Sequence, residues 1–153
     1  MAEALAKSSK KNKLIIVNGD DPEADKFLTF EIENKISFSL KDAEPYLLTE
    51  DGSTIAWNGV QIQTKLAGLF NIYNLLAAAT YAKSQNVNIT KIKQGLENFA
   101  GVLGRMQKVY SPKYRTQQNF DVIVDYAHTA ESLKSAYSVY AGKRRMICVL
   151  GST

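Results

Sequence analysis

Short apolar stretches separated by turn residues make up the first part of the chain. Residues 13–18 are mainly apolar and predict a buried strand, which the turn-forming Gly-Asp-Asp-Pro at 19–22 would end. Farther on, Ile36, Phe38 and Leu40 alternate with polar residues. Because a period of two places alternate side chains on one face, this segment predicts a half-buried strand.

Two hairpin-turn signals follow. Segments 46–49 and 54–57 flank an Asp-Gly pair at 51–52, and segment 60–66 follows an Asn-Gly pair at 58–59. Both pairs favour tight hairpin turns because their residues tolerate positive φ. The sequence therefore predicts an antiparallel meander here.

The hydrophobic spacing changes to a helical period after residue 70. Residues 71–85 are rich in Ala and Leu and lack Gly and Pro, which favours a helix that is apolar around most of its circumference. Thr90 can cap a second helix, whose apolar residues recur along one side up to Phe99. A glycine-containing loop at 100–105 and a strand at 106–110 are expected next.

The last part of the chain predicts a strand–helix–strand unit. Residues 111–119 are polar and contain a proline, so they are the candidate linker. A strand is expected at 120–124, a helix at about 130–141 and a second strand in the apolar run at 145–153. Such a βαβ unit requires parallel strands. One unit cannot cover both faces of a parallel sheet, so we expect this chain to be an internal fragment.

Composition is typical of a globular protein, since 45% of the 153 residues are hydrophobic and 22% are charged. No apolar run approaches the length of a membrane helix, and the first 13 residues carry no apolar signal region. The single cysteine, Cys148, lies in an apolar run, so we expect a buried thiol and a cytoplasmic location.

The formal net charge of +4 would suit an anionic small substrate. Basic runs at 7–13 and 143–145 carry neither interleaved aromatic residues nor a nucleic-acid-binding motif. They therefore predict solvated faces rather than a nucleic-acid site.

Two polar residues follow the strand expected at 120–124. Asp125 and His128 lie just beyond its carboxyl end, where ligands gather in open α/β sheets. An aspartate there commonly accepts hydrogen bonds from ribose hydroxyls, and an imidazole can stack on a base or donate to it. The alternative is structural, with Asp125 capping the next helix and His128 an ordinary loop residue. The pattern alone favours neither.

Three further residues are candidates for ligand binding. Asn71 and Asn74 are three positions apart, so both face one side of a first helical turn. Asn71 can simply be the N-cap, whereas Asn74 would be costly to bury without a partner such as a nucleobase edge. Arg105 follows Gly104 in a loop and can clamp phosphate, although a surface salt bridge is the simpler interpretation.

The sequence contains no Walker-type phosphate loop, no zinc-ligand cluster and no Ser-His-Asp arrangement. With one His and one Cys, a transition-metal site is not expected, and no metal ligand is assigned.

Three ordered motifs together resemble the Mur ligase family. They are GLFNIYNLLAAAT at 68–80, GVLGRMQKV at 101–109 and VIVDYAHTAESL at 122–133. The likeness spans nearly the whole chain and is greatest for the UDP-N-acetylmuramoyl-tripeptide synthetase (MurE-type) branch, whose central domain also resembles VNGDDPEADKFLTF at 17–30. Leu103 and Ala130 stand where the family usually has proline.

This resemblance implies an α/β fold in two parts. Residues 1–112 would be the later part of a central ATPase domain, built as an antiparallel meander plus helices. Residues 118–153 would be the truncated start of a Rossmann-like C-terminal ligase domain, opening with its first βαβ. ATP would bind between the two parts.

The resemblance also assigns roles in that ATP site. Asp125 would contact the ribose, His128 would lie near the adenine, and Asn74 would read the adenine edge with the support of Asn71. Arg105 would meet the phosphates and is the one candidate catalytic residue.

The implied activity is ATP-dependent acid–amino acid ligation in peptidoglycan precursor synthesis. The γ-phosphate would pass to the terminal carboxylate of UDP-MurNAc-dipeptide, with Mg²⁺ neutralising the phosphates, and the amine of a third amino acid would then displace it. The family's phosphate loop, metal ligands and carbamylated lysine would precede this sequence, so the chain alone is expected to be inactive. We expect a monomer that neither binds nucleic acid nor inserts into a membrane.

Other functions remain open. The chain could belong to another Mur branch, to a folylpolyglutamate synthase or to a cyanophycin-type ligase, although the motif at 125–133 fits the tripeptide branch better than a folate enzyme. It could also be a noncatalytic nucleotide-binding remnant. The sequence does not identify the amino acid that would be added, whether lysine, diaminopimelate or another.

Overall fold

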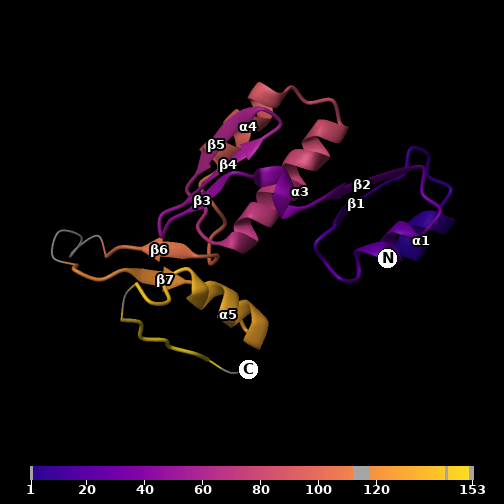
Figure 1. The fold of residues 1–153 in the computed structure, drawn as a ribbon. Helices are drawn as coiled ribbons and strands as arrows, with labels where there is room; N and C mark the ends of the chain where they lie inside the picture. The colour runs from indigo at the N-terminus through magenta and orange to yellow at the C-terminus, as the bar shows by residue number, and fades with distance from the viewer. Residues whose placement is uncertain (1, 112–117, 144, 152–153) are drawn as a thin grey trace.

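The structure is a computed structural model that describes residues 2–111, 118–143 and 145–151. Its elements in chain order are α1 (Ala2–Lys7), β1 (Leu14–Asn18), α2 (Ala24–Leu28), β2 (Asn34–Phe38), the 3-10 helix η1 (Leu40–Ala43), β3 (Tyr46–Leu48), β4 (Ser53–Trp57), β5 (Val60–Thr64), α3 (Leu69–Ser84), α4 (Ile89–Asn98), β6 (Gln107–Val109), β7 (Val122–Val124) and α5 (Ala130–Ser138). The strands form small sheets next to the helices (Figure 1), which confirms the mixed α/β class.

The antiparallel meander is confirmed. β4 pairs with β3 on one side and with β5 on the other, and the turn between β4 and β5 falls at the predicted Asn-Gly pair. Asn58 and Gly59 both have positive φ, +48° and +79°, as a tight hairpin turn requires. α3 and α4 pack against this part of the chain. The shared core consists of Phe38, Ala43, Ile55, Trp57, Ile62, Ile72, Leu75, Leu76, Ala79 and Ile92.

One detail of the predicted helices, the cap of α4, is wrong. α3 buries one face, through Ile72, Leu75, Leu76 and Ala79, while apolar residues such as Tyr81 continue around its exposed side, as predicted. α4 is capped by Asn88, whose side chain accepts a hydrogen bond from the backbone N–H of Thr90 at 2.8 Å. Asparagine is a better N-cap than threonine, so the helix begins one residue before Thr90.

β1 and β2 form a parallel pair that the sequence pattern did not reveal. Their register runs from Leu14 opposite Asn34 to Asn18 opposite Phe38, and the short helix α2 lies in the connection between them. Parallel strands cannot be joined by a tight turn, and this connection provides the crossover they need. Both strands lie beside α3, away from β6, β7 and α5 (Figure 1).

The C-terminal part differs from the expected βαβ unit. β7 pairs antiparallel with β6, with Gln107 opposite Val124 and Val109 opposite Val122. The candidate linker lies largely outside the described residues, at 112–117. After α5, residues 145–151 have no regular secondary structure, so the strand expected at 145–153 is not formed in its described part. A strand requires a neighbouring ladder, and the described residues offer this segment none.

The same segment leaves Cys148 exposed, which overturns the expectation of a buried thiol. Its neighbours Ile147 and Val149 are 82% and 94% exposed, because no sheet packs against them. None of the described helices is long and apolar enough to cross a bilayer.

Candidate functional site

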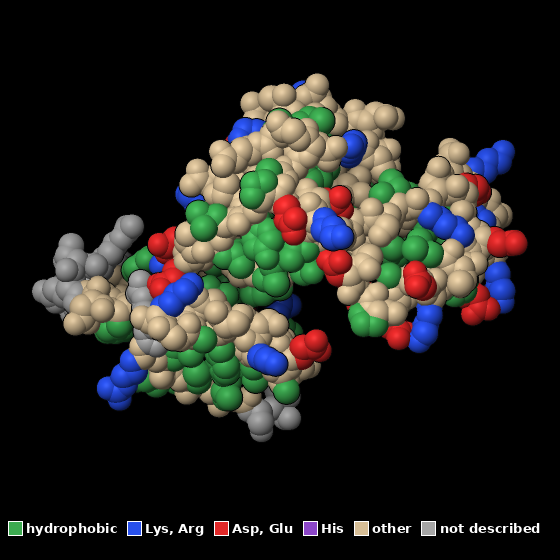
Figure 2. Space-filling model, viewed as in Figure 1, with side chains coloured by type: hydrophobic (Ala, Val, Ile, Leu, Met, Phe, Trp, Pro, Cys, Tyr) green, Lys and Arg blue, Asp and Glu red, His purple; other side chains and the backbone are tan. Residues whose placement is uncertain are grey.

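A cavity of about 1040 Å³ lies where the N-terminal end of α3 faces β6, β7 and α5. Figure 2 shows hydrophobic side chains gathered around a hollow in this region. All five candidate residues line the cavity: Asn71, Asn74, Arg105, Asp125 and His128. They come from α3, from the α4–β6 loop and from the β7–α5 loop, so the fold brings three separate segments together. The volume is at the upper end of the range for small-molecule sites, roughly 300–1,000 Å³.

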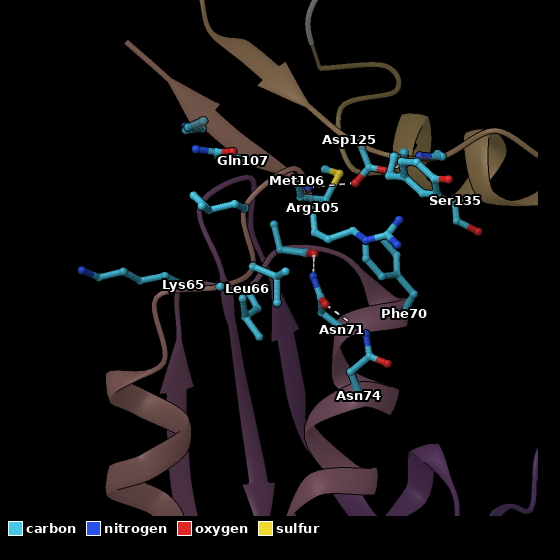
Figure 3. A pocket seen from close by; sticks show the side chains of 18 of the residues that line it. Lys65, Leu66, Phe70, Asn71, Asn74, Arg105, Met106, Gln107, Asp125 and Ser135 are labelled. Carbon is cyan, nitrogen blue, oxygen red and sulfur yellow. Dashed lines mark hydrogen bonds between the residues drawn. The ribbon is translucent and has the colours of Figure 1, made fainter. Parts of the chain in front are cut away.

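Asn71 supports the entry into α3. Its Nδ2 donates to the Ala67 carbonyl oxygen at 2.7 Å, and its Oδ1 accepts from Asn74 Nδ2 at 3.2 Å (Figure 3). The N-cap of α3 is Gly68, with a φ of +95°, so the alternative that Asn71 is the N-cap is wrong. Both hydrogen bonds hold the Asn71 carboxamide beside Asn74 at the cavity wall.

Asn74 is exposed, so the burial that would have required a partner for its carboxamide does not occur. Helical geometry turns position 74 away from the buried face of Ile72, Leu75 and Leu76. One N–H of its carboxamide is used by Asn71, and its carbonyl oxygen accepts no hydrogen bond from the described residues. A donor and an acceptor therefore remain for a ligand.

Arg105 extends into the cavity between Asp125 and Phe70 (Figure 3). Its backbone N–H donates to the Val102 carbonyl at 3.1 Å. Its guanidinium carbon lies 4.8 Å from the centre of the Tyr126 ring, and it forms no ion pair with the described residues. The salt-bridge alternative thus finds no support, and the guanidinium N–H donors remain available to an anion.

Asp125 holds two loops together. Its Oδ2 accepts from the Met106 backbone N–H at 2.8 Å, and its Oδ1 accepts from the Ala127 N–H at 2.7 Å. The cap of α5 is Thr129, whose Oγ1 accepts from the Ser132 N–H, so the alternative that Asp125 caps this helix is wrong. Each carboxylate oxygen can still accept a further hydrogen bond.

His128 is exposed and contacts Tyr126 in two ways. Its Nδ1 lies 3.0 Å from the Tyr126 carbonyl oxygen, and the two rings meet edge to face with centres 5.1 Å apart. A carbonyl oxygen only accepts, so Nδ1 carries the proton and donates. In the neutral imidazole, Nε2 is then an acceptor.

Sequence reasoning missed several cavity residues. Tyr126 and Phe70 both line the cavity. Tyr126 lies between Asp125 and His128 in the sequence, and Phe70 directly precedes Asn71. Their position next to the polar candidates could have identified them as cavity residues. Gln107 holds the loop before β6, because its Oε1 accepts from the Gly104 N–H at 2.8 Å.

Charges of both signs line the cavity. Lys108 Nζ lies 2.5 Å from Asp51 Oδ1 and 3.4 Å from Asp121 Oδ2. The pKa of Lys108 is raised, mainly by its hydrogen bond to Asp51 and further by its contact with Asp121. Lys65 also lines the cavity. Within the described part of the chain, no group of three or more His, Cys, Asp or Glu could hold a metal ion.

Comparison with known proteins identifies related sequences. A family profile described as "Mur ligase middle domain" matches residues 2–82. A UDP-N-acetylmuramoyl-L-alanyl-D-glutamate–2,6-diaminopimelate ligase of Syntrophomonas wolfei is 37% identical over 158 residues, covering 96% of this chain and 31% of that protein. A UDP-N-acetylmuramyl-tripeptide synthetase of Roseiflexus sp. is 30% identical, covering 94% of this chain and 30% of its own length.

Solved structures share the fold. MurF from Acinetobacter baumannii superposes with a TM-score of 0.75 at 21% identity, covering 88% of this chain and 30% of that chain. The chain thus spans about 30% of the length of the proteins it matches. The profile covers more than half of the chain, and close curated relatives agree with it. This chain therefore belongs to the Mur ligase family.

Proposed function

We propose that the cavity is the nucleoside side of the ATP site of an acid–amino acid ligase in peptidoglycan precursor synthesis. The observation that carries this proposal is that Asn71, Asn74, Arg105, Asp125 and His128 line one cavity, although they come from three separate segments. Family membership supports it, because the relatives are named as ligases of UDP-N-acetylmuramoyl peptides.

The chemistry of the donor set fits a nucleotide. The Asn74 carboxamide offers the acceptor and donor that an adenine edge requires, and Asn71 fixes its orientation. Asp125 has acceptor capacity left for ribose hydroxyls, and Nε2 of His128 can face the base. Arg105, without an ion pair in the described residues, can bind phosphate through its N–H donors.

Bound ATP would supply the phosphoryl group that activates a carboxylate for attack by an amine. In this step the chain's own residues bind and orient. Asp125 and Asn74 would hold the nucleoside, and Arg105 would offset phosphate charge. Because the phosphate charge shifts during transfer, Arg105 is the one proposed catalytic residue among them.

Mg²⁺ at a nucleotide site is usually held by one or two carboxylates together with the phosphates, so it would not require a cluster of three such residues in this chain. From the family resemblance, we propose that most of its protein ligands lie outside residues 1–153. We also propose the division into a central-domain part at 1–112 and the start of a C-terminal domain at 118–153, with the cavity between them. The 153-residue chain by itself is proposed to be inactive.

The proposed substrates are UDP-MurNAc-dipeptide and a third amino acid. The printed names of several relatives specify 2,6-diaminopimelate, which we therefore propose as the amine donor. We further propose that the protein works as a monomer in the cytoplasm.

Phosphate release by the full-length protein tests this function. We expect release to require ATP, UDP-MurNAc-L-Ala-D-Glu and diaminopimelate together, and to fall strongly when lysine replaces diaminopimelate. An Arg105→Ala variant controls for contaminating ATPase. Release that is independent of the dipeptide substrate would refute the ligase assignment, whereas equal rates with lysine would refute only the choice of amine.

A further inference from the structure

Tyr126 connects two of the proposed nucleotide-binding residues. Tyr126 is 65% exposed, and the centre of its ring lies 4.8 Å from the guanidinium carbon of Arg105. Its edge-to-face contact with the His128 ring spans 5.1 Å, and its backbone carbonyl accepts from His128 Nδ1 at 3.0 Å. A large exposed aromatic ring between a cation and an imidazole is not explained by core packing.

We propose that Tyr126 is a positioning residue of the nucleotide site: its ring holds the Arg105 guanidinium in the cavity, and its carbonyl fixes the tautomer of His128. This inference rests on the proposed function and deepens it. Tyr126 acts through its two neighbours, and the structure gives no reason to place it against a reacting atom.

Contact with a ring suits an arginine that must bind an anion. A carboxylate partner would occupy the guanidinium N–H donors that phosphate requires, whereas an aromatic face attracts the cation and leaves those donors free. Holding the side chain in advance also reduces the rotamer freedom that is lost when a ligand binds. Tyr126 therefore pre-orients Arg105 without competing for its ligand.

A second, more open hollow also borders Arg105. This smaller cavity, of about 380 Å³, is lined by Val102, Leu103, Arg105 and Tyr126 among others. Arg105 and Tyr126 line both cavities. Without the ring, the long Arg105 side chain has space on either side, and only the larger cavity contains Asn74 and His128.

The carbonyl contact acts separately from the ring. Because the Tyr126 carbonyl accepts from Nδ1, the neutral His128 ring keeps Nε2 as its acceptor. An acceptor at Nε2 complements an exocyclic amino group of a base. A side-chain substitution at Tyr126 retains this carbonyl, so the two roles can be tested apart.

Two variants of the 153-residue chain distinguish these roles. Tyr126→Leu removes the ring, and Tyr126→Phe removes only the hydroxyl group, which forms no hydrogen bond with the described residues. In calorimetric titrations, we expect Tyr126→Leu to weaken ATP binding about two- to fivefold, which is the change in affinity expected from loss of an exposed cation–π contact. Adenosine affinity should stay within about twofold, and Tyr126→Phe should behave as the parent chain does.

A double variant tests whether Tyr126 acts through Arg105. Adding Tyr126→Leu to Arg105→Ala should cause no further loss of ATP affinity, because the residue that is positioned is already absent. Equal losses for ATP and adenosine, equal losses for Leu and Phe, or additive losses in the double variant would each overturn the inference. Thermal melts would verify that each variant is folded.

NMR of the ligand-free chain separates this inference from the proposed function. The Nε–H resonance of Arg105 should show a ring-current shift that Tyr126→Phe retains and Tyr126→Leu loses. The His128 ¹⁵N shifts should report a protonated Nδ1 in all three chains. Absence of nucleotide binding would contradict the proposed function alone, whereas an Arg105 resonance that does not depend on the ring would contradict the positioning role alone.

Discussion

The Asp125 carboxylate accepts a hydrogen bond from the backbone N–H of Met106 at 2.8 Å, although 19 residues separate the two in the sequence. Met106 has a φ of +44°, a left-handed conformation that is uncommon for a residue with a side chain. The contact therefore fixes the backbone immediately after Arg105. Asp125 has a structural role at the site in addition to the ribose contact proposed for it.

Asp125→Ala should lower the free energy of unfolding by about 1–3 kcal/mol, because it leaves the N–H groups of Met106 and Ala127 without their acceptor. Urea denaturation of the 153-residue chain measures this loss. Glu31→Ala is the matched control, since the Glu31 side chain is exposed and forms no hydrogen bond with the described residues. Adding Met106→Gly should recover part of the loss, because glycine adopts positive φ without strain. Equal stability of Asp125→Ala and the control would contradict the account.

In the full-length protein, Asp125→Ala should raise the KM for ATP more than it lowers kcat. A ribose contact is equally strong in the ground and transition states, and loss of such uniform binding appears mainly in KM. Arg105→Ala should instead lower kcat, because phosphate charge shifts during transfer. Steady-state kinetics with ATP as the varied substrate compares the two variants. The same pattern in both would mean that the assigned roles are wrong.

Gly68 is the N-cap of α3 and lies close to Val139 at the end of α5. Its φ is +95°, and an added Cβ would lie 2.6 Å from Phe70 Cε1 and 3.0 Å from Val139 Cγ2. Gly68→Ala should therefore destabilise the chain by about 1–3 kcal/mol, through backbone strain and displacement of both side chains. Gly95→Ala should instead stabilise the chain and raise the free energy of unfolding by about 0.5–1 kcal/mol, because Gly95 lies inside α4 with open space at its Cβ position. Thermal and urea unfolding of both variants tests this difference in sign.

The ion pairs of Lys108 should make the free energy of unfolding depend on pH. Its pKa is raised above the ordinary 10.5, mainly by the hydrogen bond to Asp51. A raised pKa in the folded state means that the stabilisation is fully present below the ordinary pKa and is lost as the pH rises through the folded-state pKa. Lys108→Met should thus cost about 1 kcal/mol or less near neutral pH.

Urea unfolding near pH 8 and near pH 11.5 tests this dependence, since only the lower pH lies in the range where the Lys108 contribution is complete. The difference between the parent chain and Lys108→Met should shrink at the higher pH. Lys134→Met is the control, because Lys134 is exposed and forms no ion pair with the described residues. A difference that stays constant across this range would show that the ion pairs of Lys108 do not stabilise the fold.

Local patterns predicted the local structure well. The Asn-Gly pair at 58–59 gave the turn between β4 and β5, and the alternating segments beside it gave the meander. Pairing between strands that are distant in the sequence was harder to predict, because hydrophobic periodicity identifies a strand but not the strand it pairs with. β1 was therefore left without its partner β2, and β7 was expected in a parallel sheet although it pairs antiparallel with β6.

At the candidate site too, the sequence predicted local features but not contacts between distant segments. Motif residues identified the polar groups that line the cavity, but not how each is held. The Asn71 carboxamide bonds the Ala67 carbonyl, and Asp125 bonds Met106 across 19 residues. Such contacts depend on how loops approach one another in space, which neither spacing nor composition encodes. Tyr126 was missed because an aromatic residue beside an apolar strand is equally consistent with core packing.

The central claim is that the cavity at the N-terminal end of α3 binds ATP. Chemical-shift mapping of the ¹⁵N-labelled 153-residue chain with ATP tests it most directly, because NMR detects weak binding and locates it. We predict saturable shifts at Asn74, Arg105, Tyr126 and His128, with none at Lys26 on α2, which lies in the connection between β1 and β2 and does not line the cavity. Absence of saturable shifts, or shifts centred outside the cavity, would contradict the account.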